Sequence, residues 1–112
     1  MQQISLLLKL LEGEIKTSLG NDISGIKFMY NNYLSEGDSP EVLGETLNIL
    51  VANDDGLARI GRVCLTYFPK TIRRNKIELH QDFGLEVERV KLVSERFLED
   101  LGIQYTVEVE HA

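Results

Sequence analysis

The sequence predicts an α+β domain, with a small, mostly antiparallel sheet packed by an N-terminal and a C-terminal helix. Three observations predict this fold class. Apolar residues recur at helical spacing near both ends of the chain, β-branched and aromatic residues follow a glycine turn in the middle, and the segment 103–110 alternates between apolar and polar side chains. A mainly α-helical fold with a C-terminal strand is the alternative.

The first expected element is a helix from about Gln3 to Ser18. Its apolar positions are three and four residues apart and therefore lie on one helical face. They are Ile4, Leu7, Leu8, Leu11 and Ile15. Gly20 and Asn21 follow, and such residues commonly end a helix.

The segment from 23 to 35 fits two patterns. Ile26, Phe28 and Tyr30 alternate as in a strand, but Ile23, Ile26 and Tyr30 also share a helical face. The segment 26–32 is therefore an optional extra strand. The polar residues 35–40, which include Gly37 and Pro40, predict a turn or loop.

The segment 46–68 decides the fold, and it has two interpretations. In the first, 46–51 and 57–68 form a β-hairpin around Asn53-Asp54-Asp55-Gly56, because glycine suits the turn and β-branched and aromatic residues enrich the second arm. In the second, a helix starting near Pro40 pairs with another helix over 57–68. The hairpin is favoured because the C-terminal strand needs a partner.

A second helix is expected from Leu85 to Leu101, ended by Gly102. Its inner stripe is expected to be Val90, Val93, Phe97 and Leu101. The segment 103–109 that follows has the alternation of a half-buried strand. Since a lone strand leaves its backbone groups unpaired, we expect this strand to lie beside the arm that contains Val63.

The bulk composition predicts a single domain over residues 1–112 in a reducing, cytoplasmic setting. The single cysteine, Cys64, cannot form an internal disulfide. No apolar run approaches the ~20 residues of a membrane span. The apolar start of the chain lacks a basic leader and a small-residue cleavage site, so it is expected to be a helix and no signal peptide.

Charged residues are distributed very unevenly along the chain. The segment 59–76 contains half of the twelve basic residues and no acidic one, although the chain has a net charge of −6. Its six cations are the candidate binding residues, because such a block sets what that surface attracts. They are Arg59, Arg62, Lys70, Arg73, Arg74 and Lys76.

Three kinds of partner suit this block. The cations can neutralise the chain's own acids, such as Glu108 and Glu110, or those of a second copy; they can meet an acidic protein; or they can bind the phosphates of a nucleic acid, with Tyr67 and Phe68 as a stacking face for bases. The leading interpretation is a non-catalytic protein–protein interaction module of regulatory, adaptor or inhibitor type. A nucleic-acid-associated protein is the alternative.

No catalytic, metal or cofactor site is expected. His80 and Asp82 form a close His/carboxylate pair that would suit acid–base or metal chemistry, but Asp82 is better interpreted as the cap of the following helix. Cys64 is expected to be a small buried hydrophobe. Gly56 and Gly61 have the spacing of a phosphate-binding loop, but the Lys and Ser/Thr that such a loop requires are missing after Gly61.

Overall fold

The computed structural model describes residues 6–19, 25–52, 59–80 and 85–110. The described elements, in chain order, are α1 (Leu6–Leu19), β1 (Gly25–Leu34), β2 (Val42–Ala52), β3 (Arg59–Tyr67), the short 3₁₀ helix η2 (Ile72–Arg74), β4 (Lys76–His80), α2 (Leu85–Asp100) and β5 (Thr106–Glu110). The five strands form one sheet in the order β1-β2-β3-β4-β5. Neighbouring strands are antiparallel from β1 to β4, and β5 is parallel to β4. The predicted α+β class is confirmed.

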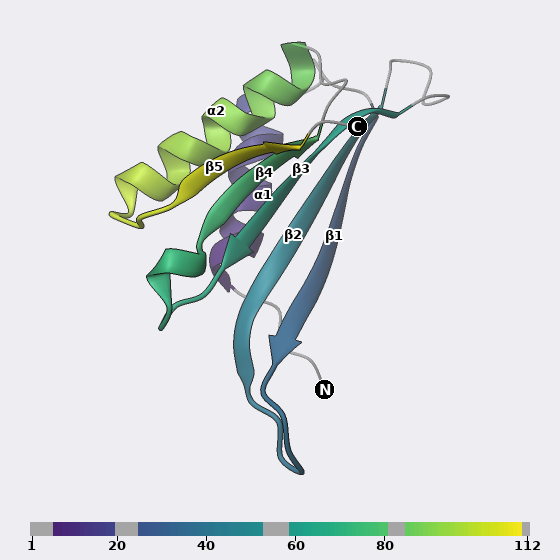
Figure 1. Cartoon of the computed structure of the whole chain (residues 1–112). Coiled ribbons are helices and arrows are strands. Elements are labelled where there is room, and N and C mark those ends of the chain that lie inside the picture. The colour runs from purple at the N-terminus through teal and green to yellow at the C-terminus, as the bar shows by residue number, and fades with distance from the viewer. Residues whose placement is uncertain (1–5, 20–24, 53–58, 81–84, 111–112) are drawn as a thin grey trace.

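The molecule has two layers, because both helices lie on the same face of the sheet (Figure 1). Strand alternation turns one apolar row towards the helices: Leu47 is opposite Leu65, and Leu65 is opposite Ile77. These side chains and the inner faces of both helices form one buried core. The other sheet face, seen from the front in Figure 1, is not covered by either helix; we call it the open face.

The expected hairpin over 46–68 is confirmed, and its helical alternative is wrong. β2 and β3 pair from Glu45–Tyr67 to Ala52–Arg59, with a register shift beside Gly61 that marks a bulge. The turn at 53–56 lies outside the described residues. The hairpin forms because alternate positions of β2 are fully buried, as in Leu47, Ile49 and Val51, which a helical stripe does not produce.

The ambiguous segment 23–35 is a strand wherever it is described. β1 pairs with β2 along its whole length, and its side chains alternate between partly buried and exposed. β1 and β2 extend past the other strands as a projecting hairpin (Figure 1). We call residues 33–43 the hairpin arm.

The C-terminal strand forms, but its predicted partner and burial were wrong. β5 pairs in parallel with β4, a strand that the sequence did not predict, and β4 separates β5 from β3 and Val63. All five residues of β5 are exposed, and Val107 and Val109 keep 39% and 44% of their surface accessible. Because β5 is an edge strand, it gains backbone hydrogen bonds without deep burial.

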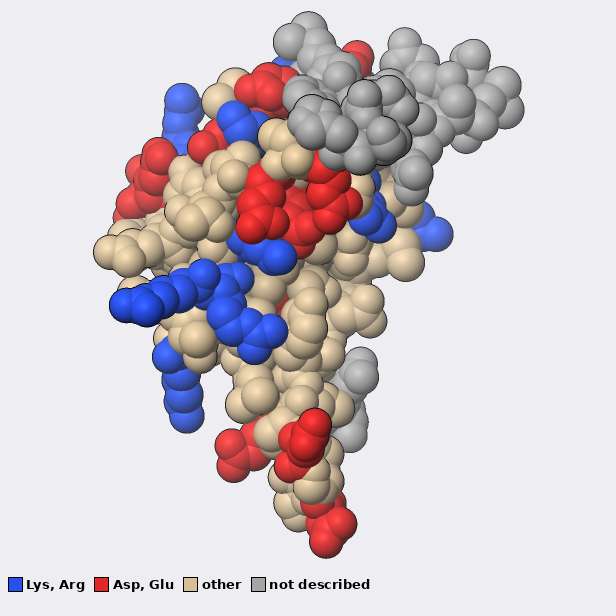
Figure 2. All heavy atoms as spheres, viewed as in Figure 1, with Lys and Arg blue, Asp and Glu red and all other residues tan. Residues whose placement is uncertain are grey.

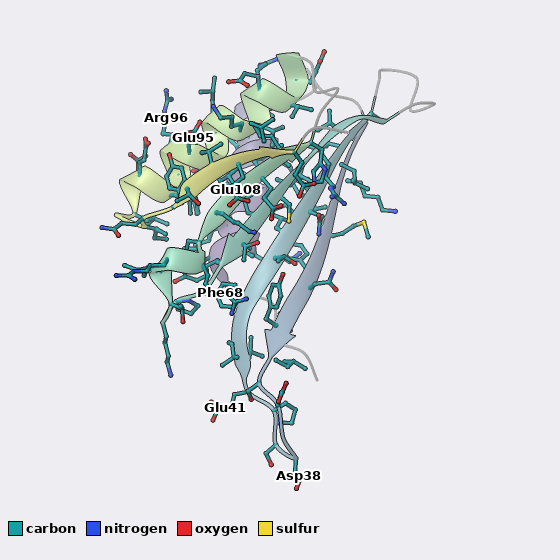
Figure 3. The ribbon with its side chains drawn as sticks, viewed as in Figure 1. Asp38, Glu41, Phe68, Glu95, Arg96 and Glu108 are labelled. Carbon is teal, nitrogen blue, oxygen red and sulfur yellow. The ribbon has the colours of Figure 1, made fainter. Side chains whose placement is uncertain are left out.

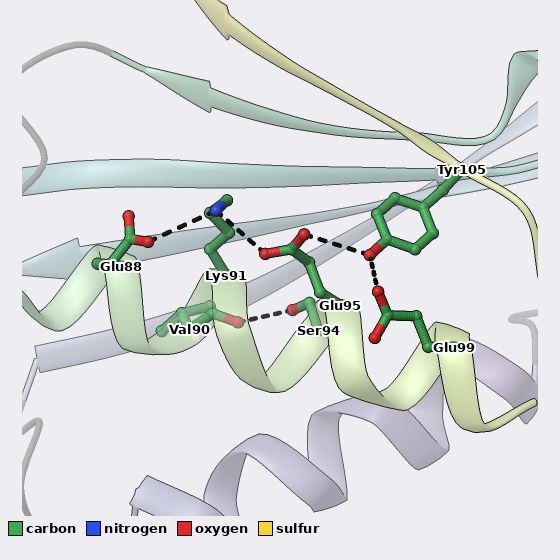
Figure 4. Close-up of polar contacts among 7 residues, drawn as sticks. All are labelled: Glu88, Val90, Lys91, Ser94, Glu95, Glu99 and Tyr105. Atoms are coloured by element: carbon green, nitrogen blue, oxygen red, sulfur yellow. Dashed lines mark hydrogen bonds and ion pairs between the residues drawn. The ribbon is translucent and has the colours of Figure 1, made fainter.

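The second helix ends at Asp100, and Gly102 follows with a positive φ of 71°. Its inner face is rotated from the predicted stripe: Leu101 is 52% exposed, whereas Val87, Val90, Ser94 and Leu98 are buried. Ser94 is tolerated there because its hydroxyl donates to the Val90 carbonyl at 2.8 Å (Figure 4). The predicted cap, Asp82, lies outside the described residues.

The described helices include none that is long and apolar enough to cross a membrane.

Candidate functional site

The structure divides the six predicted cations into two groups. Arg62 lies on β3 and faces the open side of the sheet next to His80. Lys70, Arg73, Arg74 and Lys76 lie together near the base of the hairpin arm, where they line two adjoining hollows that share Arg74. The backbone of the sixth cation, Arg59, belongs to β3, but its side chain lies outside the described part of the chain.

A compact loop presents these cations. After β3 the chain turns at Pro69 and forms η2, and hydrogen bonds from Thr71 N to Phe68 O (3.3 Å) and from Arg74 N to Thr71 O (2.9 Å) close the turn. Asn75 is 2% exposed and fixes the loop to its surroundings. Its side-chain oxygen accepts from the Phe68 N–H at 2.6 Å, and its amide nitrogen donates to the Gln104 carbonyl at 3.2 Å. The loop therefore holds its side chains in a fixed frame.

Phe68 supports this loop from the open face of the sheet. Its ring is buried against Gly44, where a Cβ atom would lie less than 3.0 Å from three ring atoms. The Tyr33 ring is 5.1 Å away between centroids. The guanidinium carbon of Arg74 lies 3.8 Å from the Phe68 centroid and 5.7 Å from that of Tyr33. Arg74 is thus held by cation–π contacts to both rings.

The expected neutralisation by the chain's own acids occurs at Lys76. Its ammonium group lies 3.3 Å from Glu78 and 3.7 Å from Glu108, and the hydrogen bond to Glu78 raises the pKa of Lys76. Glu108 reaches Lys76 from the neighbouring strand β5 (Figure 3). Lys76 therefore has a structural role, because its ion pair with Glu108 links β4 to β5.

The remaining three cations differ. Lys70, Arg73 and Arg74 are exposed, and no carboxylate of the described residues lies within 4.0 Å of them. We call these three residues the basic cluster. Figure 2 shows a group of blue side chains on this side of the molecule, directly beside a group of red acidic side chains on the sheet. An exposed cation with no carboxylate of the described residues at ion-pair distance is available to bind an anionic group.

The hollow beside the basic cluster has a volume of about 210 Å³. Two guanidinium groups, one ammonium group and three hydroxyl-bearing side chains line it, together with Phe68 and one carboxylate. The lining residues are Tyr33, Thr66, Phe68, Arg73, Arg74, Lys76, Thr106 and Glu108. These donors suit a carboxylate or another small anion.

The projecting hairpin arm is a surface feature that the sequence did not predict. Its described apolar side chains remain 40–46% exposed: Tyr33, Leu34, Val42 and Leu43. Its tip has three exposed carboxylates, Glu36, Asp38 and Glu41, with no ion pair to the described residues. Figures 2 and 3 show the acidic side chains at the end of the arm, with Asp38 at its far end. The sequence signal was the acidic polar turn at 35–40, which alone could not show that the arm projects.

The tip is also well fixed. The Ser35 N–H donates to the Glu41 carbonyl at 2.8 Å, and the Glu41 N–H donates to the Ser35 hydroxyl at 2.8 Å. Gly37 has φ of 120°, a conformation that side-chain-bearing residues rarely adopt. The arm therefore presents its carboxylates on a closed loop.

His80 lies on the open face of the sheet, between Arg62 and Glu110. The Arg62 guanidinium donates to His80 Nε2, and His80 Nδ1 lies 3.1 Å from a Glu110 oxygen. Because a guanidinium can only donate, Nε2 accepts and the ring proton is on Nδ1, where it is donated to Glu110. Both ring nitrogens are thus engaged in a row that ties β3, β4 and β5 together. Asp82 lies outside the described residues.

Two further predictions are corrected by strand alternation. Cys64 is half-buried on the open face because Val63 and Leu65 occupy the core face, and burial together with the Glu78 charge raises the pKa of its thiol. Tyr67 and Phe68 point to opposite faces, and Phe68 is buried beneath Arg74. They do not form a common stacking face for bases.

A larger hollow of about 380 Å³ lies between the two helices. Apolar side chains such as Leu92, Phe97 and Leu101 line it, and its charges are mixed: Glu14, Arg96 and Asp100. It therefore lacks the single sign of charge that distinguishes the basic cluster.

The comparisons with known proteins found no family model that matches the chain, and no similar chain among curated proteins or solved structures. The geometry of the surface is therefore the basis for a functional proposal.

Proposed function

We propose that this protein is a non-catalytic interaction module that binds an acidic segment of a protein partner through the basic cluster. One observation carries the proposal: Lys70, Arg73 and Arg74 are held beside a polar hollow with no carboxylate of the described residues within ion-pair distance. The chain is acidic overall, so leaving these cations unpaired is unexpected unless they have an external partner.

The surroundings favour carboxylates over a nucleic-acid backbone. Nucleic-acid binding depends on neutralising many phosphates along a track, usually with aromatic side chains that stack on bases. Here Glu108 lines the hollow with Arg73 and Arg74, and Glu78 and Glu108 both lie within ion-pair distance of Lys76. The Phe68 ring is covered by Arg74. A short acidic segment needs only the few cations of the cluster, whereas a nucleic-acid backbone needs a longer track.

The test uses two immobilised probes, a short poly-glutamate peptide and a single-stranded oligonucleotide. The variant Lys70→Glu/Arg73→Glu reverses the two cluster cations that do not support Phe68. The control variant Lys27→Glu/Arg96→Glu makes the same change in net charge at exposed cations outside the cluster. We expect wild type and the control variant to be retained on the peptide at low salt. We expect the cluster variant not to be retained.

Two outcomes would contradict the proposal. Equal retention of the cluster variant and the control would show that the cluster does not contribute. Retention of wild type on the oligonucleotide, but not on the peptide, would favour the nucleic-acid alternative.

A further inference from the structure

The hairpin arm and the basic cluster have complementary surfaces. The arm ends in three carboxylates that have no cation of the described residues within ion-pair distance. The cluster has three cations that have no carboxylate of the described residues within the same distance. Both surfaces also expose apolar side chains: the arm exposes Leu34 and Val42, and Ile72 beside the cluster is 50% exposed. Opposite charges framed by apolar surface are typical of a protein–protein contact.

The two surfaces of one molecule form no ion pair with each other among the described residues. Glu41 is the tip carboxylate that lines a hollow with Lys70 and Arg74, and it lies beyond ion-pair distance of both. Asp38 lies further out, at the end of the arm and away from Phe68 (Figure 3). The β1–β2 pairing continues to Leu34 and Val42, and the tip of the hairpin beyond it points away from β4 and β5 (Figure 1).

We infer that the acidic segment bound by the basic cluster is the hairpin arm of a second copy of this chain. In a two-fold dimer, two arms lie side by side in opposite directions, and the tip of each arm reaches the cluster at the base of the other. Such a reciprocal contact is closed, as in most homodimers. This inference rests on the proposed function, because it names the partner of the same cluster.

The reciprocal arrangement explains three features together. It pairs the carboxylates of Glu36 and Asp38 with the partner's cations, and it places the partner's acidic tip beside the polar hollow. It also covers the apolar sides of both arms, where Tyr33, Leu34, Val42 and Leu43 are 40–46% exposed. Several exposed apolar side chains on one projecting segment are typical of an interaction site.

The decisive experiment is a charge swap read by light scattering, which separates a 12.7 kDa monomer from a dimer of twice that mass. The tip variant is Glu36→Lys/Asp38→Lys, and the cluster variant is Lys70→Glu/Arg73→Glu. Wild type is expected to dimerise at low salt. Each variant alone brings like charges together, so its dissociation constant is expected to rise by at least about tenfold.

Mixing the two variants restores both contacts. The reversed tip of one meets the reversed cluster of the other, and the remaining native tip and native cluster also match. We therefore expect an equimolar mixture to form heterodimers. The control Glu14→Lys/Asp100→Lys changes the net charge as much as the tip variant does, at exposed helical sites; it is expected to dimerise like wild type. Circular dichroism verifies that every variant is folded.

A monomeric wild type at millimolar concentration and low salt would overturn the inference, as would a mixture of folded variants that stays monomeric. The proposed function fails separately, because its probe is the poly-glutamate peptide. Retention of a monomeric wild type on that peptide would keep the interaction module and remove the dimer. Failure of the peptide to retain a wild type that is also monomeric would remove both.

Discussion

Arg74 lies over the ring of Phe68, with its guanidinium carbon 3.8 Å from the ring centroid. The ring in turn occupies the space above Gly44, where any Cβ atom would clash with it. Because Gly44 has no side chain, the Phe68 ring can lie directly against β2. The ring in turn positions Arg74, a cation of the basic cluster. This stack joins the stability of the sheet to the geometry of the candidate binding surface.

The first prediction concerns Gly44. Gly44→Ala places a methyl group less than 3.0 Å from Phe68 and is expected to lower the free energy of unfolding by about 1–3 kcal/mol, as in other overpacked sites. The control is Gly13→Ala in α1, where nothing lies within 4 Å of the added Cβ. This control is expected to stabilise the helix by roughly 0.5–1 kcal/mol. Urea unfolding measures both, and equal effects at the two glycines would contradict the packing argument.

A second prediction concerns Asn75. In Asn75→Ala, the buried Phe68 N–H and the Gln104 carbonyl both lose their partner, and the free energy of unfolding is expected to fall by about 2–4 kcal/mol. Asn75→Asp keeps an acceptor for the Phe68 N–H but cannot donate to Gln104. It should therefore lose stability as well, because its new carboxylate is buried. Urea unfolding of the two variants checks this, and an unchanged midpoint in Asn75→Ala would show that the loop does not depend on these bonds.

Most of the fold could be predicted because burial follows strand alternation. The hairpin over 46–68 was predicted from its glycine turn and its β-branched second arm, and the burial of Leu47, Ile49 and Val51 agrees with that prediction. β4 was missed because it is five residues long, has only Ile77 and Leu79 as buried positions, and follows a basic loop. The partner of β5 was missed for a different reason: alternation fixes which side of a strand faces inward, but not which strand lies beside it.

The candidate site could be predicted only in part. The six cations were evident from the sequence, but their pairing depends on the sheet register. Lys76 meets Glu108 because β5 runs parallel to β4, whereas Arg73 on η2 has no such neighbour among the described residues. The projection of the arm depends on β1 and β2 being longer than the other strands, and no local pattern in residues 35–40 contains that information.

The third prediction is a loss of stability in acid that depends on Glu12. Its carboxylate accepts from Lys16 at 2.8 Å and from the Tyr30 hydroxyl at 2.6 Å, and these two hydrogen bonds, Lys16 first, lower the pKa of Glu12 below its ordinary 4.5. The stabilisation is therefore present above pH 4.5 and is lost as the pH falls through the lower pKa of the folded state.

Glu12→Gln is accordingly expected to be less stable than wild type at neutral pH, with the difference shrinking as the pH falls from 5 towards 3. Urea unfolding over that range measures it. Glu14→Gln, at an exposed position of the same helix, is the matched control and should keep the pH dependence of wild type. A constant difference between Glu12→Gln and wild type across the range would contradict the assignment.

The last prediction concerns alkaline pH and the tyrosine that fixes the approach to β5. The Tyr105 hydroxyl lies 2.8 Å from a Glu99 oxygen and 3.2 Å from a Glu95 oxygen, and Glu95 is joined to Lys91 (Figure 4). Burial, followed by the hydrogen bond to Glu99, raises the pKa of Tyr105 above its ordinary 10.0. This contribution is therefore complete below pH 10.0 and is lost as the pH rises through the higher pKa of the folded state.

Tyr105→Phe is expected to be less stable than wild type at pH 8 and to lose less stability between pH 8 and 11, because it no longer has a phenol whose ionisation places a negative charge between two carboxylates. The control Tyr33→Phe removes a hydroxyl with no hydrogen bond to the described residues and should follow wild type. Lysines titrate in the same range in all three proteins, so the difference between variants isolates the tyrosine. If Tyr105→Phe and wild type declined in parallel above pH 10.0, the bridge from Tyr105 to α2 would not contribute to folding.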